Sequence, residues 1–367
     1  MTYGNVNVDT VTTSTPNGIL GAGNASIMKN RIINGAMVID QRNAGASVTA
    51  SDGAFDVDRW LMYLSNSTGS KGNMQQNQGS VTPPVGFTNY LGFTTTSAYS
   101  VGTNDGYALQ QRIEGYNMAD LGWGTANAKT VTLSFWAYSS LTGTFGGAIA
   151  NGGANYAYPF SYSIPVANTW TQISVTIAGA TSGTWLTTNG IGAFVSFSVG
   201  TGTTYSGTAG AWTGSFKISA TGATSVVGTN GATFYITGVQ LEVGSSATGF
   251  EYRQYTTELQ LCQRYLPYFV GQNQWAGQAF AVSNSVIPIN FPVTARVPPT
   301  GLVYSGPFSC LTATGSGASA TLSLGGTGAQ SSYVFFATSS AFIAGNATVG
   351  YGSNATTSIV YFTGCEL

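Results

Sequence analysis

The sequence predicts an all-β protein with an extended N-terminal arm, a jelly-roll β-sandwich, a short linking helix and a second, smaller β-rich C-terminal domain. Three observations lead to this prediction. Apolar and polar residues alternate with period two in many short segments, the links between these segments are rich in Gly, Ser, Thr and Asn, and only 6% of the 367 residues are charged. Such alternation is typical of half-buried antiparallel strands.

Residues 1–45 are predicted to form the arm, because the first 29 residues are mostly small and polar and show no sustained period. The sandwich is predicted over 46–248. Its clearest strands are 131–138, 170–179, 191–200 and 233–244, with weaker candidates at 59–65, 89–93, 107–113, 159–166 and 215–219. In 233–244 the apolar phase reverses around Gly238, which indicates a β-bulge.

The linking segment 249–266 is predicted to contain a helix over 258–266. Thr257 would be its N-cap with Gln260 three residues on, and Pro267 would end it. Leu259, Cys262 and Leu266 would then face inward. The C-terminal domain, 267–367, is predicted to be built from strands at 279–293, 301–304, 320–324, 333–337 and 358–362.

Composition excludes several classes of function. The net charge is −1 and no basic cluster occurs, so the sequence predicts no nucleic-acid partner. Histidine is absent, which excludes Ser-His-Asp and Cys-His catalysis. We expect no membrane insertion, because no apolar run reaches 18 residues, and no secretory signal, because no basic region followed by an apolar core opens the sequence. The three cysteines, Cys262, Cys310 and Cys365, are expected to be buried free thiols.

The charges are unevenly distributed. Between Thr130 and Leu241 only Lys217 is charged, and between 265 and 367 only Arg296 and Glu366 are. These two nearly uncharged tracts coincide with the strand-rich regions. Uncharged strands lack the side chains that normally deter association, so composition favours an oligomer.

Three segments resemble phage and prophage tail-fibre-like virion proteins: NRIINGAMVIDQRNAG at 30–45, VQLEVGSSATGFEYRQYTTELQLCQRYLPYF at 239–269 and INFPVTARVPPTG at 289–301. DRWLMYLS, ALQQRIEG, TLSFWAYSS and FYITGVQLE in addition resemble a carbohydrate-binding-module-like jelly roll. The resemblance implies a homotrimeric virion component, assembled in the host cytoplasm, that attaches to the particle through the arm and contacts the host surface. It carries over no catalytic residue.

Saccharide binding would use aromatic faces together with hydrogen bonds from amide and carboxylate groups. The candidates are Trp136 and Tyr138 on the polar side of strand 131–138, with Tyr162 and Trp185 in neighbouring polar-aromatic stretches. The alternative is that both sheet faces are covered, by the other sheet and by a neighbouring subunit.

Charged residues suggest two further roles. Asp52, Asp56 and Asp58 could bind a structural Ca²⁺; the alternative is a solvated turn in which one of them pairs with Arg59. No cofactor is otherwise expected. Arg264 and Arg296 are candidates for a subunit interface, where they would bind carboxylates or main-chain carbonyls.

The sequence therefore predicts a non-enzymatic tail fibre or receptor-binding protein whose partner is a host surface polysaccharide. A capsid decoration or head-fibre protein is the first alternative. A polysaccharide depolymerase is the second, although no carboxylate pair marks a hydrolytic cleft.

Overall fold

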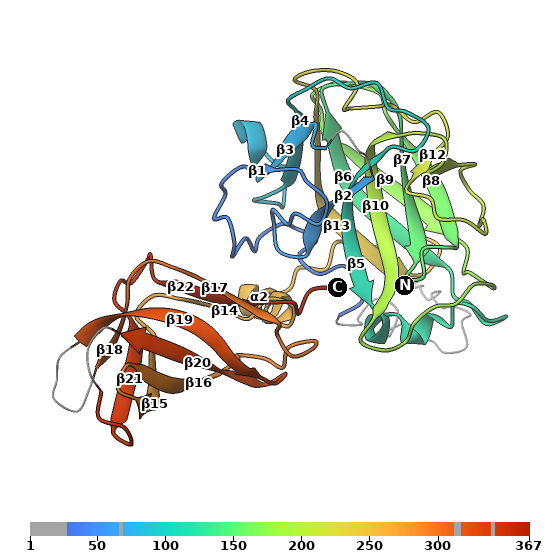
Figure 1. Ribbon diagram of the computed structural model, residues 1–367. Coiled ribbons are helices and arrows are strands. Elements are labelled where there is room, and N and C mark those ends of the chain that lie inside the picture. Colours follow the sequence, from blue (N-terminus) through green and yellow to red (C-terminus); the bar gives the residue numbers. More distant parts are fainter. Residues whose placement is uncertain (1–27, 66–68, 312–316, 339–341) are drawn as a thin grey trace, which may run out of the picture. The chain divides into compact units, whose positions relative to one another are not determined.

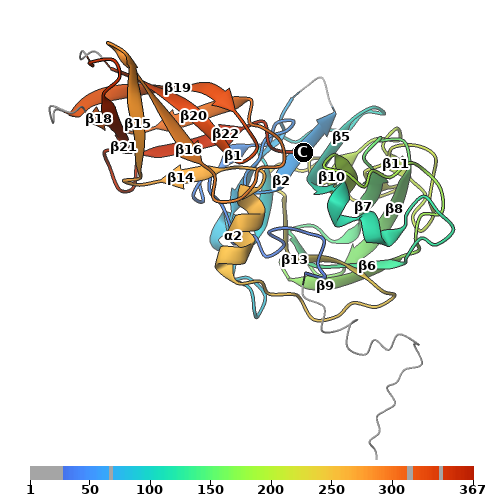
Figure 2. The ribbon, with the colours of Figure 1, turned by 90° about the horizontal axis from the view of Figure 1, so that it is seen from below.

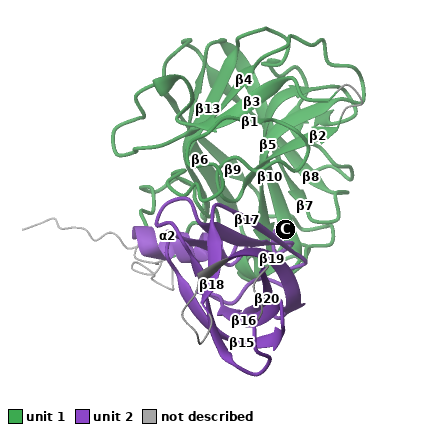
Figure 3. Ribbon diagram, turned by 60° about the vertical axis from the view of Figure 1, so that its left-hand side comes forward, with its two compact units in different colours: residues 1–253 green, residues 254–367 purple. Residues whose placement is uncertain are grey.

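A computed structural model describes residues 28–65, 69–311, 317–338 and 342–367, and confirms the all-β class. The chain divides into two compact units, residues 1–253 and 254–367 (Figures 1 and 3). Residues 1–27, and with them most of the expected arm, lie outside the described residues.

Unit 1 is a sandwich of two antiparallel sheets, which Figure 2 shows as two facing layers. The first sheet has the order β1-β3-β4-β13-β6-β9, formed by Val48–Thr49, Gly72–Gln76, Leu91–Thr95, Thr233–Val243, Val131–Ser139 and Thr171–Ile177. The second has the order β2-β5-β10-β7-β8, formed by Trp60–Ser65, Gly106–Glu114, Ile191–Thr201, Gly143–Asn151 and Ala157–Ile164.

Smaller elements complete unit 1. Strands β11 (Ser206–Gly207) and β12 (Ser219–Ala220) form a short parallel pair. Three 3₁₀ turns are described, η2 (Gln78–Ser80), η3 (Gly115–Asn117) and η4 (Ala119–Leu121).

The period-two alternation sends one side of each strand into a single core between the sheets. Val131, Leu133, Phe135 and Ala137 of β6 are buried there, as predicted. The expected bulge is confirmed, since the pairing of β13 with β6 shifts register between Thr237 and Gln240. Gly238 adopts φ 62°, a conformation that glycine reaches without strain.

Residues 30–39, which the sequence assigned to the arm, are part of the sandwich. Ile32, Met37 and Ile39 are at most 1% exposed. The main-chain N–H of Arg31 donates to Leu241 O, and that of Val239 donates to Gly35 O. Strand β4 pairs only with positions 233–236 of β13, so this segment takes up the remaining hydrogen bonds along that edge.

Unit 2 begins with helix α2 (Tyr255–Gln263), three residues earlier than predicted. Its N-cap is Gln254 rather than Thr257, and the N–H of Glu258 donates to Gln254 O. Cys262 and Leu266 are buried as expected, whereas Leu259 is half-buried. The helix is followed by a sheet of order β14-β22-β17, formed by Tyr268–Val270, Ile359–Thr363 and Gly301–Ser305.

The rest of unit 2 is a closed barrel of order β15-β16-β20-β19-β18-β21. Its strands are Gln274–Ala281, Asn284–Asn290, Ser331–Thr338, Gly317–Thr327, Phe308–Leu311 and Ala347–Gly352. Ile287, Ile289, Val334 and Phe336 fill the barrel. Within the described residues, no helix is both long and apolar enough to cross a membrane.

Candidate saccharide-binding hollow

The outer face of the six-stranded sheet carries the polar side of β6. Trp136 of this strand lies in register between Thr237 of β13 and Gln172 of β9. The side chain of Trp136 is partly exposed and that of Gln172 is exposed, whereas Phe135, the residue before Trp136 on β6, faces the core. The strand period therefore places an indole and an amide side by side on the outside of the sandwich.

A hollow of about 220 Å³ opens beside Trp136. It is lined by Val85, Phe87, Ser134, Phe135, Trp136, Gln172, Gly238, Thr248, Phe250 and Tyr252. None of these residues is charged. The hollow is therefore a neutral site whose walls combine aromatic rings with amide and hydroxyl groups, the composition that small-molecule sites share.

Three aromatic rings form one wall. The ring centroids of Phe87 and Phe250 are 5.1 Å apart, those of Phe250 and Tyr252 are 4.9 Å apart, and those of Phe87 and Tyr252 are 5.6 Å apart. The Tyr252 hydroxyl donates to Gly86 O at 2.8 Å, and burial raises the pKa of this phenol. Phe250 packs edge-to-face against both Phe87 and Tyr252, and this packing fixes the three rings before any ligand binds.

The bulge shapes the floor of the hollow. A Cβ atom on Gly238 would lie 2.6 Å from the Phe87 ring, so only glycine lets this ring lie against the strand. The bulge thus joins the aromatic wall to the sheet, and its position on β13 decides where the hollow lies.

Polar groups in the hollow are free to bind a ligand. Among the described residues, no hydrogen bond engages the Gln172 amide, the Ser134 hydroxyl or the indole N–H of Trp136. Thr248 differs, because its hydroxyl donates to Glu242 Oε2 at 2.6 Å. The unengaged donors and acceptors stand next to exposed ring faces, so a polyhydroxylated ligand could use both.

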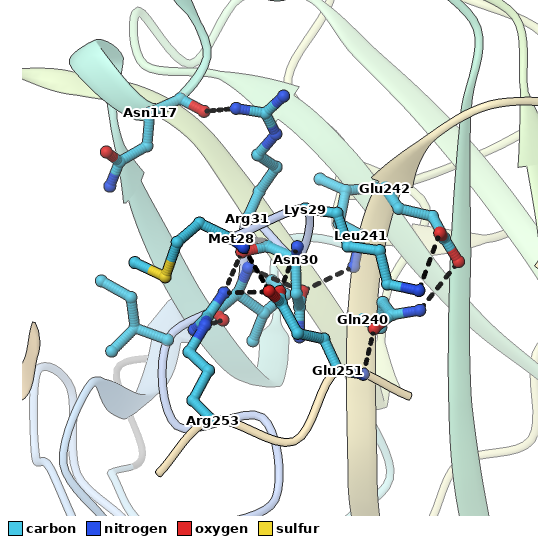
Figure 4. Close-up of polar contacts among 12 residues, drawn as sticks. Met28, Lys29, Asn30, Arg31, Asn117, Gln240, Leu241, Glu242, Glu251 and Arg253 are labelled. Atoms are coloured by element: carbon cyan, nitrogen blue, oxygen red, sulfur yellow. Dashed lines mark hydrogen bonds and ion pairs between the residues drawn. The ribbon is translucent and has the colours of Figure 1, made fainter. Parts of the chain in front are cut away.

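The wall segment 248–253 is held by a polar clasp on its other side, shown in Figure 4. Thr248, Phe250 and Tyr252 line the hollow. Glu251 and Arg253 each follow one of these aromatic residues in the sequence, and they form the clasp. The N–H of Asn30 donates to Glu251 Oε2 at 2.8 Å, and Arg253 Nη1 donates to Ile32 O at 3.1 Å. The Arg253 and Glu251 side chains pair at 3.3 Å.

The clasp continues onto β13. The Gln240 amide donates to Glu242 Oε1 at 2.8 Å, and its Oε1 accepts the N–H of Glu251 at 2.8 Å. Lys29 Nζ lies 3.7 Å from Glu242 Oε2. Gln240 and Glu242 are at most 2% exposed, so solvent and salt screen the attraction between Lys29 and the Glu242 carboxylate only weakly. The same segment therefore forms a wall of the hollow and anchors the chain where the described N-terminal residues begin.

The four predicted saccharide residues have different surroundings. Trp136 lines the hollow. Tyr138 lies on the same sheet face but is 9% exposed, because its ring stacks on Tyr235 at 5.1 Å and packs beside Trp170 at 5.4 Å. Tyr138 therefore belongs to an aromatic cluster that flanks the hollow rather than to its lining.

Tyr162 is a correction. It is 6% exposed and packs in the core against Phe135, with ring centroids 5.0 Å apart. It follows Phe160 in phase on β8, so the alternation that buries Phe160 buries it too. Burial strongly raises the pKa of its phenol. Its side chain faces the core and cannot contact a ligand in the hollow.

Trp185 also lies outside the hollow. Its ring packs edge-on against Trp123 at 4.7 Å and against Trp212 at 5.6 Å, and its indole N–H donates to Ser182 O. These contacts make it part of a tryptophan cluster formed by loops. Sequence alone could not separate such a cluster from an exposed platform.

The proposed Ca²⁺ ligands do not converge, which corrects that expectation. Asp58 accepts both the main-chain and side-chain N–H groups of Gln41, and Asp52 accepts the N–H of Leu64. Asp56 is fully buried, and neither carboxylate oxygen has a hydrogen-bond partner in the described residues. No group of three acidic, cysteine or histidine side chains suited to a metal occurs among the residues described.

Arg264 and Arg296 bind main-chain carbonyls within unit 2. Arg264 Nη1 donates to Thr294 O at 3.2 Å, and Arg296 donates to Cys365 O at 2.8 Å and to Glu366 O at 2.5 Å. The carbonyl partners agree with part of the expectation. Their place at a subunit interface stays a prediction.

Sequence reasoning missed most of the lining. Thr248, Phe250 and Tyr252 alternate along the chain, so a local period-two signal was present. Phe87 had no such signal, since its place depends on the bulge 151 positions away at Gly238. All three cysteine side chains are buried, as predicted.

No family model and no curated protein matches this sequence. The chain is similar to several solved structures. The enzymatically active domain of tailspike protein 4 from bacteriophage CBA120 shares 13% identity over 59% of this chain and 22% of that one, with a TM-score of 0.33.

Two further solved structures are similar to this chain to about the same degree. A putative sugar-binding protein from Bacteroides thetaiotaomicron shares 14% identity over 59% of this chain and 100% of that one, with a TM-score of 0.32. A structure described as CBM4 shares 15% identity over 57% and 98%, with a TM-score of 0.31. TM-scores of this size establish no function.

Proposed function

We propose that this protein binds a neutral stretch of a host-surface polysaccharide in the hollow beside Trp136, as a phage virion protein of the tail-fibre or receptor-binding type. The observation that carries the proposal is the lining. Aromatic rings stand next to unengaged amide, hydroxyl and indole N–H groups, and no charged side chain is present.

The chemistry of the lining suits a saccharide. A sugar ring has an apolar C–H face that packs on an aromatic ring, and hydroxyl groups around its edge that need hydrogen-bond partners. Trp136 offers the ring face, and Gln172 and Ser134 offer the partners. An acidic sugar would meet no counter-charge, so the bound unit is neutral.

The proposal is for binding without hydrolysis. Glycoside hydrolysis needs two carboxyl groups flanking the scissile bond. The lining of the hollow includes no Asp or Glu.

The assignment to a virion rests on the resemblance of segments 30–45, 239–269 and 289–301 to tail-fibre-like proteins. On this proposal the chain is a homotrimer that attaches to other virion proteins through its N-terminal arm. The clasp around Glu251 and Arg253 supports this role, because it fixes residues 28–32, through which load on the arm would reach the sandwich.

The binding proposal is tested with purified full-length chain and host surface polysaccharide. Trp136→Ala and Tyr252→Ala are expected to weaken binding by about tenfold or more, since each removes an aromatic contact. Tyr116→Ala is the matched control, because Tyr116 is 60% exposed and Tyr252 is 61% exposed. Equal binding by all three variants and the unaltered chain would refute the proposal.

The location on the particle is tested by labelling intact virions with an antibody against unit 2. Label at the tail supports a receptor-binding fibre. Label on the capsid, with adsorption unchanged when unit 2 is deleted, would instead establish the head-fibre alternative.

A further inference from the structure

A second hollow, of about 260 Å³, lies on the barrel of unit 2, where β19 and β20 form a hairpin (Figure 1). It is lined by Pro288, Gly326, Thr327, Gly328, Ser331, Ser332 and Tyr333. All of these residues belong to unit 2, so the hollow is complete without any part of the sandwich. Its size is below that of sites for drug-sized ligands, which suits one small ring.

Tyr333 is the centre of this hollow. It is 42% exposed, and it lies in register between Pro288 on β16 and Gly326 on β19. A Cβ atom on Gly325 or on Gly326 would lie 2.2 Å from a carbon of the Tyr333 ring. The phenol ring therefore lies flat on two glycines, with its other face toward solvent.

The position of the ring is built into the fold. Pairing of β19 with β20 shifts register between Leu324 and Gly326, so Gly325 is the extra residue of a bulge. Phe335 packs edge-on against Tyr333, with ring centroids 5.7 Å apart and planes at 85°. Two glycines in a bulge and a neighbouring ring hold the tyrosine in one orientation, which reduces the entropy lost when a ligand binds.

The surroundings indicate the ligand class. Thr327 and Ser331 place hydroxyl-bearing side chains beside the ring. Ser332 shares the strand phase of the buried Val334 and Phe336, so its side chain faces the barrel interior and offers no hydroxyl group to this ligand. Unit 2 beyond residue 264 has only Arg296 and Glu366 as charged residues, and neither lines the hollow. A phosphate or carboxylate ligand would find no counter-charge there.

We infer that unit 2 carries a second saccharide-binding site, in which a neutral sugar ring stacks on Tyr333 and hydrogen-bonds to the hydroxyl groups around it. The inference goes beyond the function proposed for unit 1, because it assigns a separate site to a different unit. Each unit would then carry a saccharide site of its own, complete without residues of the other unit.

The test uses the full-length chain and a panel of neutral methyl glycosides of glucose, galactose, mannose and N-acetylglucosamine. Binding is followed by saturation-transfer NMR in a Trp136→Ala background, so that the remaining signal comes from outside the first hollow. Adding Tyr333→Ala is expected to raise the Kd by roughly tenfold or to abolish the signal. Tyr255→Ala, at a residue 62% exposed on α2, is the matched control and is expected to keep it.

Gly325→Ala is a second variant that keeps the ring but displaces it, and it is expected to weaken binding as Tyr333→Ala does. Circular dichroism establishes that each variant is folded. Binding that Tyr333→Ala leaves unchanged would overturn the inference. Complete loss of binding in Trp136→Ala alone would overturn it as well, while leaving the function proposed for unit 1 intact. If the unaltered chain binds no member of the panel but binds host polysaccharide through Trp136, only this second site is refuted.

Discussion

Asp56 makes the stability of the sandwich depend on pH. Its side chain is fully buried in unit 1, and neither oxygen has a hydrogen-bond partner in the described part of the chain. Burial, and secondarily the nearby charge of Asp40, raises its pKa from 3.8 to about 7. Below about pH 4 the carboxyl group is protonated in both the folded and the unfolded chain, so it carries no penalty.

As the pH rises through 4, the unfolded chain releases this proton while the folded chain keeps it. Stability therefore falls between about pH 4 and about pH 7 and stays low above that range. The shift from 3.8 to about 7 is roughly three pKa units, which corresponds to about 4 kcal/mol in all. From about pH 5 to about pH 8 the loss is about 2 to 3 kcal/mol.

Asp56→Asn removes the titrating group and keeps the shape. Between about pH 5 and about pH 8, the free energy of unfolding measured in urea should fall by about 2 to 3 kcal/mol less in Asp56→Asn than in the unaltered protein. Tryptophan fluorescence reports mainly on unit 1, which contains Trp60, Trp123, Trp136, Trp170, Trp185 and Trp212 of the seven tryptophans.

Asp52→Asn is the control, because Asp52 lies four residues before Asp56 but is exposed. It is expected to keep the pH dependence of the unaltered protein. Parallel pH profiles for Asp56→Asn and the unaltered protein would refute the reasoning.

Three further results are expected. Gly238→Ala should destabilise unit 1 by about 1–3 kcal/mol in urea, because φ is 62° and the new methyl group would meet Phe87; an unchanged midpoint would contradict this. Tyr162→Phe removes a buried hydroxyl that has no partner among the described residues, so stability should hold or rise by about 1 kcal/mol with saccharide binding intact; lost binding would contradict its core position. The cysteine thiols should react with a thiol reagent only on unfolding, since all three are buried and burial raises the pKa of Cys365 to about 11; rapid labelling of native protein would disagree.

The strands of unit 1 could be predicted from local alternation, and so could the bulge at Gly238, because both are written in consecutive residues. The same signal placed Trp136 on the outer face of β6. It also contained the burial of Tyr162, which shares the phase of Phe160 on β8. Tyr162 was wrongly predicted to bind saccharide because the stretch around it is rich in polar residues, although the period of two places Tyr162 on the buried face.

The start of α2 was misplaced for a different reason. Thr257 fits an N-cap by residue type, but the helix begins at Tyr255, and Gln254 O accepts the first helical hydrogen bond from Glu258. Capping preferences are weak compared with the packing that positions a helix. The boundary of the arm was also misplaced. Strand β4 pairs only with the first part of β13, and residues 30–35 form main-chain hydrogen bonds to the later part, which depends on the order of strands in the sheet.

The sequence by itself determined the class of fold and the two faces of each strand, because side-chain direction follows from a period of two residues. It also determined that the sheet surfaces would be nearly uncharged. Only the tertiary structure decided which faces are covered. Tyr252 and Gly86, 166 positions apart, meet at the first hollow, and Pro288 and Gly326 meet across Tyr333 at the second. A side chain's accessibility depends on such long-range neighbours, which periodicity within one strand does not contain.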